Sequence, residues 1–584
     1  MEKKNIRLFF LLRMREMYHK DSLDSYRVRN HNTLTLLDEL QKVIEGRLQN
    51  RVKRNETVKY CIEEFIDSLN KDNCIDFSFF DKNEFINKIN SFKTDINNNE
   101  NQIKEESSNE LLFYIRKCIK CNKSKYLLCL LNDIEEKLFD EKEIEENQEY
   151  VYLEEFDKTI SSFATELIHI GYSKGFLYRY FNGLSLGDDV TRDKKLFESL
   201  KKQFLNHEKK NYKIVFRLQM TGQHNSYVKE LFSDYPEFKE KVPDELFQKA
   251  DNNKSQLKPN PAVRFYINQI SALDPISAVK ECRIILSRII DIRHNGSINT
   301  SIEIPHCAYT FECINNGNDY KAQFYNSLIL DSTNGGIKAD TQKFVESLDR
   351  IDQDQTITQD VKDRIKFALR HLRIGDAQPE VEQRFINYWV GLEFIFSSPS
   401  SSESTFMRMK KHFTNIHFCS YAKRNMYWFN NWLIKSKVIS SGQLFWEDPD
   451  IETKIKTYKN VLAFYRYKIL KRSMLVHSDK RKSYLNKHQT NIERHLSRLY
   501  RLRNELIHEA TTKEYIENST SNLRYYLVFL INQIVYQFSK DNENRMISTI
   551  NDFFMEYECS FNRIRLKWEF EVLMGVDFTD DLLS

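Results

Sequence analysis

The sequence predicts a mainly helical protein with an α+β region in its middle, and three features of the chain support that prediction. Only 14 Gly and 9 Pro occur among 584 residues, so little of the chain can form turn-dense β structure. Lys, Glu, Leu and Ile instead fill long stretches that contain no helix breakers. Strand-like stretches that alternate and carry β-branched residues stand out between residues 212 and 330. A chain of this length is expected to divide into several domains.

Residues 1–149 are predicted to form an N-terminal helical region. Leu36, Leu40 and Val43 recur at the spacing of one helix face. Residues 92–109 (FKTDINNNENQIKEESSN) are polar and of low complexity, which predicts a linker or loop.

Residues 150–345 are predicted to form an α+β middle domain. Val151–Ile170 and Pro275–Ile292 have helical patterns. Three stretches have the alternation of strands, namely Tyr212–Leu218 (YKIVFRL), Ser301–Phe311 and Gln323–Leu330. Nothing in these residues indicates a purpose for the region.

The chain is predicted to become helical again from residue 346 to residue 540. The four clearest helices are at Val361–Leu372, at Gln378–Phe396, near 487–509 and near 513–538. Residues 541–584 are expected to form a C-terminal tail with one or two further helices.

Charge is distributed unevenly along the chain. The net charge is only +4, but residues 401–510 contain 22 Lys and Arg against 9 Asp and Glu, a surplus of +13. The rest of the chain therefore carries −9. A polyanion such as RNA or DNA is the expected partner of the basic segment, and a solvated basic face is the alternative.

Ten scattered cysteines predict a reducing, cytoplasmic environment and no disulfide framework. Cys118 and Cys121 form one CxxC pair without a second pair or a His pair at zinc spacing, so no metal or cofactor is expected. The apolar residues Leu8–Leu12 are followed at once by Arg13, which favours a core helix over a signal peptide. No apolar run is long enough to cross a membrane.

The segment His488–Ala510 (HQTNIERHLSRLYRLRNELIHEA) contains the residues best suited to chemistry. Its apolar stripe predicts a helix packed against a core, and consists of Leu496, Leu499, Leu502 and Leu506. Asn504 and His508 are four residues apart and share a different face, with Arg503 beside them. Arg498 and Arg501 add positive charge nearby.

This trio suits cleavage of RNA, whose 2′-hydroxyl is an internal nucleophile. Histidine titrates near neutral pH and can take or give a proton. Arginine presents a planar, permanently charged fork to phosphate oxygens. Asn504 can orient a phosphate oxygen or the histidine. No metal is required, because the nucleophile is already tethered to the phosphate.

The spacing of Arg and His is not a motif by itself. It recurs at several other places, of which Arg472 and His477 (RSMLVHSD) are the nearest competitor and a second candidate RNA contact. Only at Arg503 and His508 does an Asn follow the Arg directly, on a helix with a clean apolar stripe.

The stretch RLYRLRNELIHEA resembles the third helix of Apea-like HEPN domains, which has an arginine-rich RN-three-residues-H signature. Phe385–Phe396 (FINYWVGLEFIF) is similar to the second helix of that family, with its W-x-x-L-E pattern at Trp389, Leu392 and Glu393. Asp363–Arg373 looks like the preceding helix. The resemblance covers residues 350–540, about a third of the chain.

The resemblance implies a bundle of four or five helices that pairs as a homodimer, so that Arg and His from two copies meet in one cleft. It implies a metal-independent ribonuclease that leaves 2′,3′-cyclic phosphate ends and acts in anti-phage defence. A polar residue of the second helix often supports such a site. Glu393 is the candidate here and Asn387 the weaker one, and a purely structural pairing of Glu393 is the alternative.

The leading hypothesis is therefore an RNA endonuclease with a defence or toxin role, and tRNA is one candidate substrate. A non-catalytic RNA- or partner-binding module is the first alternative, and a helical adaptor whose basic segment faces an acidic protein is the second. His508 could instead cap its helix. The aromatic cluster of Tyr427, Trp428, Phe429 and Trp432 could stack on bases, although a core role is more usual.

Overall fold

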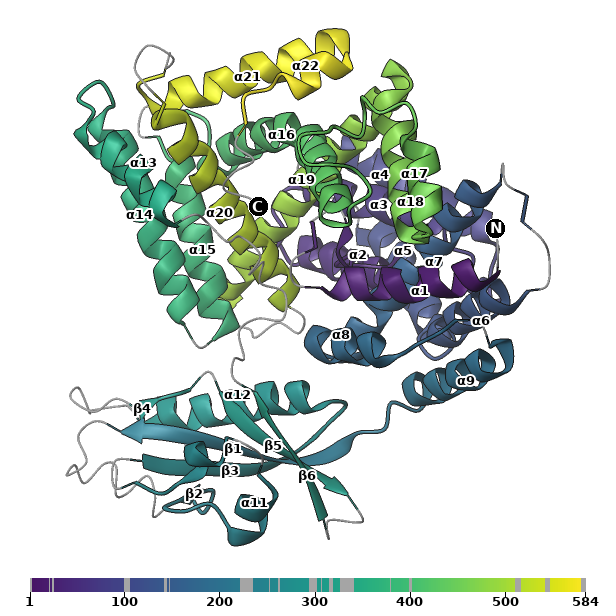
Figure 1. Cartoon of the computed structure of the whole chain (residues 1–584), viewed down its shortest axis with the longest axis vertical. Coiled ribbons are helices and arrows are strands. Elements are labelled where there is room, and N and C mark those ends of the chain that lie inside the picture. Colours follow the sequence, from purple (N-terminus) through teal and green to yellow (C-terminus); the bar gives the residue numbers. More distant parts are fainter. Residues whose placement is uncertain are drawn as a thin grey trace.

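The computed structural model describes residues 3–578, with gaps. The gaps are residues 20–21, 24–25, 99–104, 141–143, 146–147, 188, 221–234, 251–252, 261–262, 294–301, 306, 315–318, 326–340, 379, 399–401, 510–515 and 541–546. The described chain is mainly helical, as predicted, and a small antiparallel sheet lies at one end of the molecule (Figure 1). No helix in these residues is long and apolar enough to cross a bilayer.

In the described part of the chain, nine helices precede the sheet. They are α1 (Lys3–Tyr18), α2 (Thr33–Leu48), α3 (Asn55–Leu69), α4 (Lys82–Asn98), α5 (Glu105–Asn122), α6 (Tyr126–Phe139), α7 (Glu149–Ile170), α8 (Lys174–Gly183) and α9 (Val190–Asn206). Their apolar faces form one core that runs from Ile6 to Phe204. The helices α7–α9 therefore pack with the N-terminal region, although the sequence placed residues from 150 onward in the middle domain. The physical reason is that Phe156, Leu177 and Phe204 bury their side chains in this helical core.

The predicted linker at 92–109 is largely helical. Helix α4 continues to Asn98 and α5 begins at Glu105. Ile89, Phe92 and Ile96 follow one face of α4 and are buried, so apolar packing overrides the polar composition of the segment. Residues 99–104 lie outside the described part of the chain.

The sheet has the strand order β2-β3-β1-β5-β6, with β4 paired to the end of β1, and every pairing is antiparallel. Its strands are β1 (Lys210–Met220), β2 (Phe238–Lys239), β3 (Val263–Ala272), β4 (Ile302–Glu303), β5 (Ala308–Ile314) and β6 (Asp319–Tyr325). The strand predicted at Tyr212–Leu218 is confirmed as β1. The stretch predicted as one strand at Ser301–Phe311 contains β4 and the start of β5, which continues to Ile314. The strand predicted at Gln323–Leu330 begins earlier, at Asp319, and residues 326–330 lie outside the described chain.

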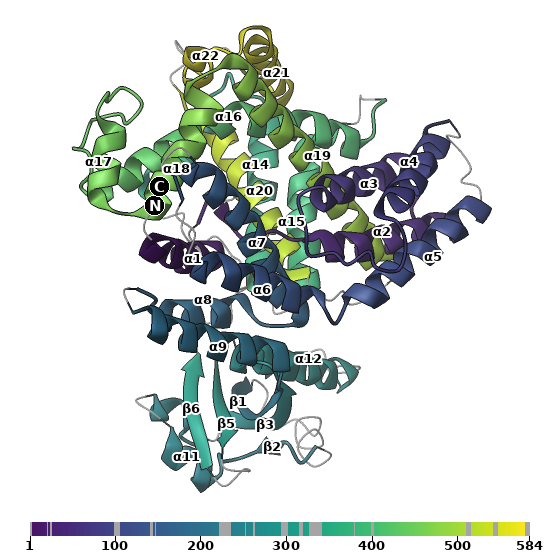
Figure 2. The ribbon, with the colours of Figure 1, turned by 90° about the vertical axis from the view of Figure 1, so that its right-hand side faces the viewer.

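Helix α12 (Pro275–Arg293) covers one face of the sheet, and the short helix α11 (Asp244–Lys249) lies on the other. Figure 2 shows α8 and α9 between the sheet and the other N-terminal helices. The buried Asp274 joins the two parts, because its carboxylate accepts hydrogen bonds from the Ser173 backbone and hydroxyl, both at 2.8 Å. The sheet is thus anchored to the start of α8.

The C-terminal helices share a second large core. They are α13 (Thr341–Gln353), α14 (Gln359–Ala377), α15 (Val381–Phe396), α16 (Thr405–Lys435), α17 (Ile451–Tyr458), α18 (Val461–Leu470), α19 (Ser478–Glu509), α20 (Ile516–Phe538), α21 (Ile550–Lys567) and α22 (Phe570–Met574). Helix α15 contacts α14, α16, α19 and α20, so these five helices pack together. The predicted tail helices, α21 and α22, pack into the same core.

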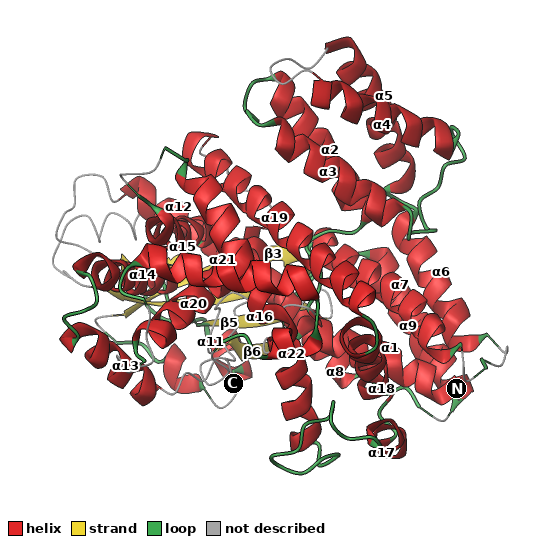
Figure 3. Cartoon of the chain, turned by 90° about the horizontal axis from the view of Figure 1, so that it is seen from above, coloured by secondary structure: helices red, strands yellow, loops and turns green. Residues whose placement is uncertain are grey.

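Helix α19 has 32 residues and begins nine residues before the predicted helix. Leu496, Leu499 and Leu506 are buried, which confirms the apolar stripe. In Figure 3, α2–α5 gather into a lobe, and α19 passes beside it. This long helix therefore belongs to the C-terminal bundle and also contacts α3 of the N-terminal region.

Candidate active site

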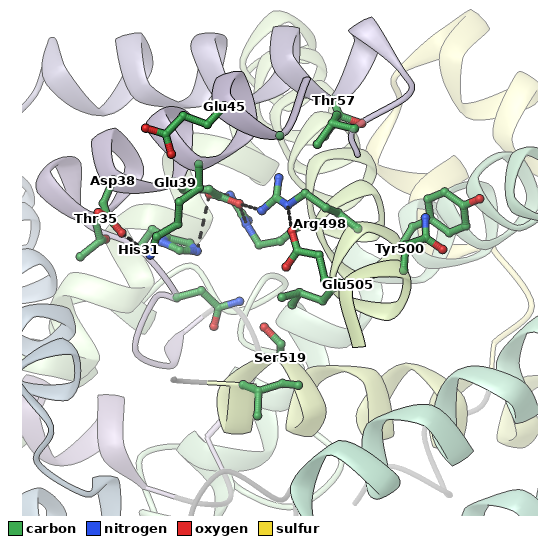
Figure 4. Close-up of a pocket in the computed structure, with 18 of the residues that line it drawn as sticks. His31, Thr35, Asp38, Glu39, Glu45, Thr57, Arg498, Tyr500, Glu505 and Ser519 are labelled. Atoms are coloured by element: carbon green, nitrogen blue, oxygen red, sulfur yellow. Dashed lines mark hydrogen bonds and ion pairs between the residues drawn. The ribbon is translucent and has the colours of Figure 1, made fainter. Parts of the chain in front are cut away.

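A cavity of about 1380 Å³ separates the N-terminal helices from the C-terminal end of α19 (Figure 4). Helix α2 and the loop into α3 line one side, and α19 lines another. The ends of α7 and α5 and the start of α20 complete the lining. Eight Lys and Arg residues line this cavity against five Asp and Glu residues, a basic surplus of three. The α19 residues are Arg498, Tyr500, Arg501, Leu502, Arg503, Asn504 and Glu505.

Two of the predicted catalytic residues, Arg503 and Asn504, line this cavity together. The Nη1 of Arg503 donates to Oδ1 of Asn504 at 3.1 Å. The Arg503 side chain is 26% exposed, and its buried Nε has no hydrogen-bond partner among the described residues. The guanidinium has five N–H donors, so the exposed part of it can bind an anion at the cavity.

Glu393 lies on the other side of the Arg503 guanidinium. Its Oε2 is 3.8 Å from Nη2 of Arg503 and accepts a hydrogen bond from the Trp389 indole at 3.0 Å. Helix α15 therefore holds the carboxylate, and the carboxylate in turn orients the arginine. The weaker candidate, Asn387, is bonded to Gln383 and to His371 of α14 instead.

His508 belongs to the last turn of α19. Its side chain lies outside the described part of the structure, as do residues 510–515. The catalytic role expected for His508 thus stays a prediction from the sequence.

Arg498 and Arg501 have structural partners that the sequence did not indicate. Arg498 donates through Nε and Nη2 to the two oxygens of Glu39, both at 2.8 Å, and also bonds Glu64 at 2.7 Å. Arg501 bonds Glu39 as well, and lies 3.6 Å from Glu505. The side chains of Arg498 and Arg501 are 8% and 13% exposed. The two arginines therefore neutralise carboxylates at this interface, and their expected contact with RNA stays a prediction.

Glu39 is the centre of this ion-pair cluster, which Figure 4 shows between α2 and α19. Burial alone would raise the pKa of Glu39, but Arg498 and Arg501 outweigh it and lower that pKa well below its usual range. His31 lies 3.6 Å from Glu39, yet burial lowers the pKa of His31 well below 6.5. Neutral His31 thus lines the cavity beside a permanently charged cluster.

Part of the basic surplus of residues 401–510 is met within the chain. Arg494 pairs with Asp67 of α3 at 3.0 Å. Arg466 pairs with Glu16 of α1, and Lys410 pairs with Glu56 of α3. The N-terminal helices therefore neutralise some of this positive charge, and the polyanion expected for the segment stays a prediction.

Arg472 and His477 lie at the opposite end of α19 from Arg503. Arg472 is in the π-helical turn Lys471–Leu475, and His477 is exposed just before the helix begins. The 25 residues from Ser478 to Arg503 span about 38 Å at about 1.5 Å per residue. Arg472 is 55% exposed, stacks on Tyr150 and pairs loosely with Glu154 at 3.8 Å. Within one chain, Arg472 and His477 therefore lie far from the cavity.

The aromatic cluster of α16 packs mainly inside the protein. Phe429 is fully buried and stacks on Trp432, while Tyr427 contacts Trp446 and Trp428 contacts Tyr26. These contacts support the core interpretation over base stacking.

Sequence reasoning missed the N-terminal half of the lining. Thr35 belongs to α2, Lys53 and Arg54 lie in the loop before α3, Thr57 is in the first turn of α3, and Lys123 follows α5. The basic run from Arg47 to Arg54 is the one signal that pointed there. These basic residues line a cavity only because α19, more than 400 residues later in the chain, lies opposite them.

Comparison of the chain with protein-family models, with curated proteins and with solved structures finds no match to any of them. Function therefore has to be argued from the site itself.

Proposed function

We propose that the chain is a metal-independent RNA endonuclease of the HEPN type, with Arg503, Asn504 and His508 as its catalytic residues. The observation that supports this most is the contrast between neighbouring arginines of α19. Arg498 and Arg501 are enclosed by carboxylates, whereas Arg503 lines a basic cavity with a side chain that is 26% exposed. The packing of α14, α15, α16, α19 and α20 also agrees with the bundle of four or five helices that the resemblance implies.

In the proposed reaction, the 2′-oxygen of a ribose attacks the adjacent phosphorus. The 2′-hydroxyl gives up its proton, the 2′-O–P bond forms and the P–O5′ bond breaks. The 5′-oxygen takes up a proton as it leaves, so the products carry a 2′,3′-cyclic phosphate and a 5′-hydroxyl. His508 is proposed to accept or donate one of these protons.

Arg503 is proposed to bind the non-bridging oxygens of the phosphate, where negative charge builds up in the transition state. Asn504 and Glu393 hold its guanidinium from two sides, at 3.1 Å and 3.8 Å. An arginine fixed before substrate arrives loses little side-chain entropy on binding. Glu393 thus acts as a positioning residue.

A role in anti-phage defence or as a toxin is part of the proposal, and growth tests it. Expression of the wild-type chain should slow growth and fragment cellular RNA, whereas His508→Ala should do neither. If both chains were equally toxic or cleaved RNA equally, His508 would have no part in the mechanism.

Pairing of two copies through the bundle is also proposed from the resemblance. The face of α19 that bears Arg494 and Arg498 is already packed on the N-terminal helices, so pairing would use other bundle surfaces. Sedimentation equilibrium of the full chain should give twice the chain mass of 70.0 kDa, and the mass of one chain at all concentrations would contradict it.

A non-catalytic interaction module is the second candidate. It is favoured by the ion pairs between α19 and α3, because they give Arg494 and Arg498 a structural task. RNA binding that weakens with salt, without any cleavage by the wild-type chain, would support this alternative.

A further inference from the structure

We propose that the N-terminal helices supply the second wall of the substrate site, and that the cavity binds a single-stranded segment of RNA. The backbone of this segment would lie between Lys53 and Lys123 on one side and Arg503 on the other. The identification of the cleaved phosphate at Arg503 rests on the proposed function. The proposal that the N-terminal helices bind RNA depends only on the cavity and on the charges that line it.

Lys53 and Lys123 are the cations best placed to meet phosphates. Both line the cavity and are exposed, and neither forms an ion pair with a described carboxylate. Lys42, also in the lining, is paired with Asp38 at 2.6 Å. The two lysines thus differ from Lys42, because no carboxylate of the described part of the protein forms an ion pair with them.

The two walls are fixed to each other by interactions that leave the cavity open. The Arg54 guanidinium lies 5.6 Å from the Tyr500 ring and 5.1 Å from the Phe406 ring. The Arg498 ion pairs with Glu39 and Glu64 join α19 to α2 and α3. A buried ion pair with several hydrogen bonds favours one geometry over others. The position of Lys53 relative to Arg503 is therefore set before any ligand binds.

The size and the lining of the cavity favour a single strand. Its 1380 Å³ exceeds the range of about 300–1,000 Å³ that holds most small ligands. The lining mixes apolar Leu34, Val52 and Ile168 with polar Asn518 and Ser519. Unstacked bases need apolar surface for their faces and polar groups for their edges, whereas a duplex offers mainly phosphates and 2′-hydroxyls. A flexible strand also lets the 2′-oxygen reach the in-line position that a regular helix denies it.

RNA affinity of the full chain tests this inference. In a His508→Ala background, which is expected to prevent cleavage, anisotropy would follow binding of a short RNA of about 12 nucleotides and of the same sequence as a duplex. The double variant Lys53→Ala/Lys123→Ala should bind the single strand about tenfold or more weakly, with its salt slope reduced by about 1.4, or about 0.7 per lost phosphate contact. Lys53→Arg/Lys123→Arg should restore affinity. Lys202→Ala, an exposed lysine of α9 outside the cavity lining, is the matched control.

The outcomes separate this inference from the proposed function. An unchanged affinity and salt slope in the double variant, with cleavage lost on Arg503→Ala, would overturn the N-terminal wall and leave the nuclease in place. Equal or tighter binding of the duplex would overturn the preference for a single strand. Lysine-dependent binding without cleavage by the wild-type chain would support the wall and overturn the nuclease. Absence of RNA binding in all chains would overturn both.

Discussion

An arginine followed five residues later by a histidine occurs just before the start of α19 and again near its end. The two pairs differ in exposure and in the residues that surround the arginine. Arg472 projects from a π-helical turn, loosely paired with Glu154, and His477 is exposed. Arg503 lines a cavity with a second wall and is held by Asn504 and Glu393. An Arg–His spacing therefore indicates function only where the fold supplies a cavity and residues that position the arginine.

The arginines of α19 also differ from one another in what they contact. Arg494 and Arg498 serve the packing of α19 on α3, whereas Arg503, only five residues after Arg498, faces the cavity. Substitutions and a change of pH can therefore distinguish the basic residues of α19 that stabilise the fold from the one proposed to contact RNA.

Arg498→Ala is expected to lower the free energy of unfolding by about 3 kcal/mol or more, because it removes the main buried partner of Glu39. Arg472→Ala, at an exposed pair, should change it by less than about 1 kcal/mol. Urea denaturation of both variants measures the difference. Similar midpoints for the two would show that Arg498 is not structural.

Arg503→Ala is expected to reduce the rate of RNA cleavage at saturating substrate by about 100-fold to 1,000-fold, because charge on the phosphate loses its main donor. Arg472→Ala should leave the rate within about twofold, because an arginine at the far end of α19 cannot stabilise charge on the reacting phosphate. Single-turnover kinetics with a labelled RNA measures both rates. Comparable losses in the two variants would mean that the far end of α19 also takes part in cleavage.

Stability should fall as the pH is lowered from about 7 to about 5, because α19 and its neighbours bury neutral histidines. Burial lowers the pKa of His495 to about 3, and burial also lowers the pKa values of His31 and His417 well below 6.5. Below about pH 6.5 the unfolded chain binds a proton at each site that the folded chain does not. Each of these histidines then lowers the free energy of unfolding by about 1 kcal/mol per pH unit. Above about pH 6.5 the histidines are neutral in both the folded and the unfolded chain, so this loss of stability does not occur.

Urea midpoints across this pH range measure that loss. His495→Gln should make the dependence shallower, since an amide can still bond Tyr526, to which Nδ1 of His495 lies 2.7 Å away. His477→Gln is the control at the exposed end of the helix. A slope that changes equally in both variants would argue against buried neutral histidine as its cause.

Glu393→Gln is expected to slow cleavage by at most about fivefold, because a partly exposed ion pair is worth no more than about 1 kcal/mol. The thermal midpoint should stay the same, since Trp389 can still donate to the amide oxygen. Asn387→Ala, on the same helix, should have no effect on the rate. A loss of several hundredfold in Glu393→Gln would make Glu393 a catalytic residue rather than a positioning one.

Local patterns were enough to predict much of the fold. The alternation at Tyr212–Leu218 identified β1, and the apolar stripe of Leu496 and Leu499 identified α19. Polar composition misled at residues 92–109, where Phe92 and Ile96 are buried. Segment composition is a weak guide when a few apolar residues share one helix face.

The site was predictable in part, for a physical reason. Arg503 and Asn504 are consecutive residues of one helix, and the long arginine side chain can reach the asparagine amide, although the two residues point about 100° apart around the helix. The partners of Arg498 and the opposite wall at Lys53 depend on α2 and α3 meeting a helix more than 400 residues later. No local pattern encodes such a contact, and charge counting could not tell an internal acidic partner from RNA.

Attack by the 2′-oxygen is tested most directly with one oligonucleotide in two forms, with EDTA present. The wild-type chain should cut a single-stranded RNA and leave a 2′,3′-cyclic phosphate, detected by mass spectrometry. The same strand with a single 2′-deoxy nucleotide before the scissile phosphate should stay intact at that position. Cleavage of the deoxy-substituted strand at the same rate, or loss of all activity in EDTA, would contradict attack by the 2′-oxygen at Arg503 and His508.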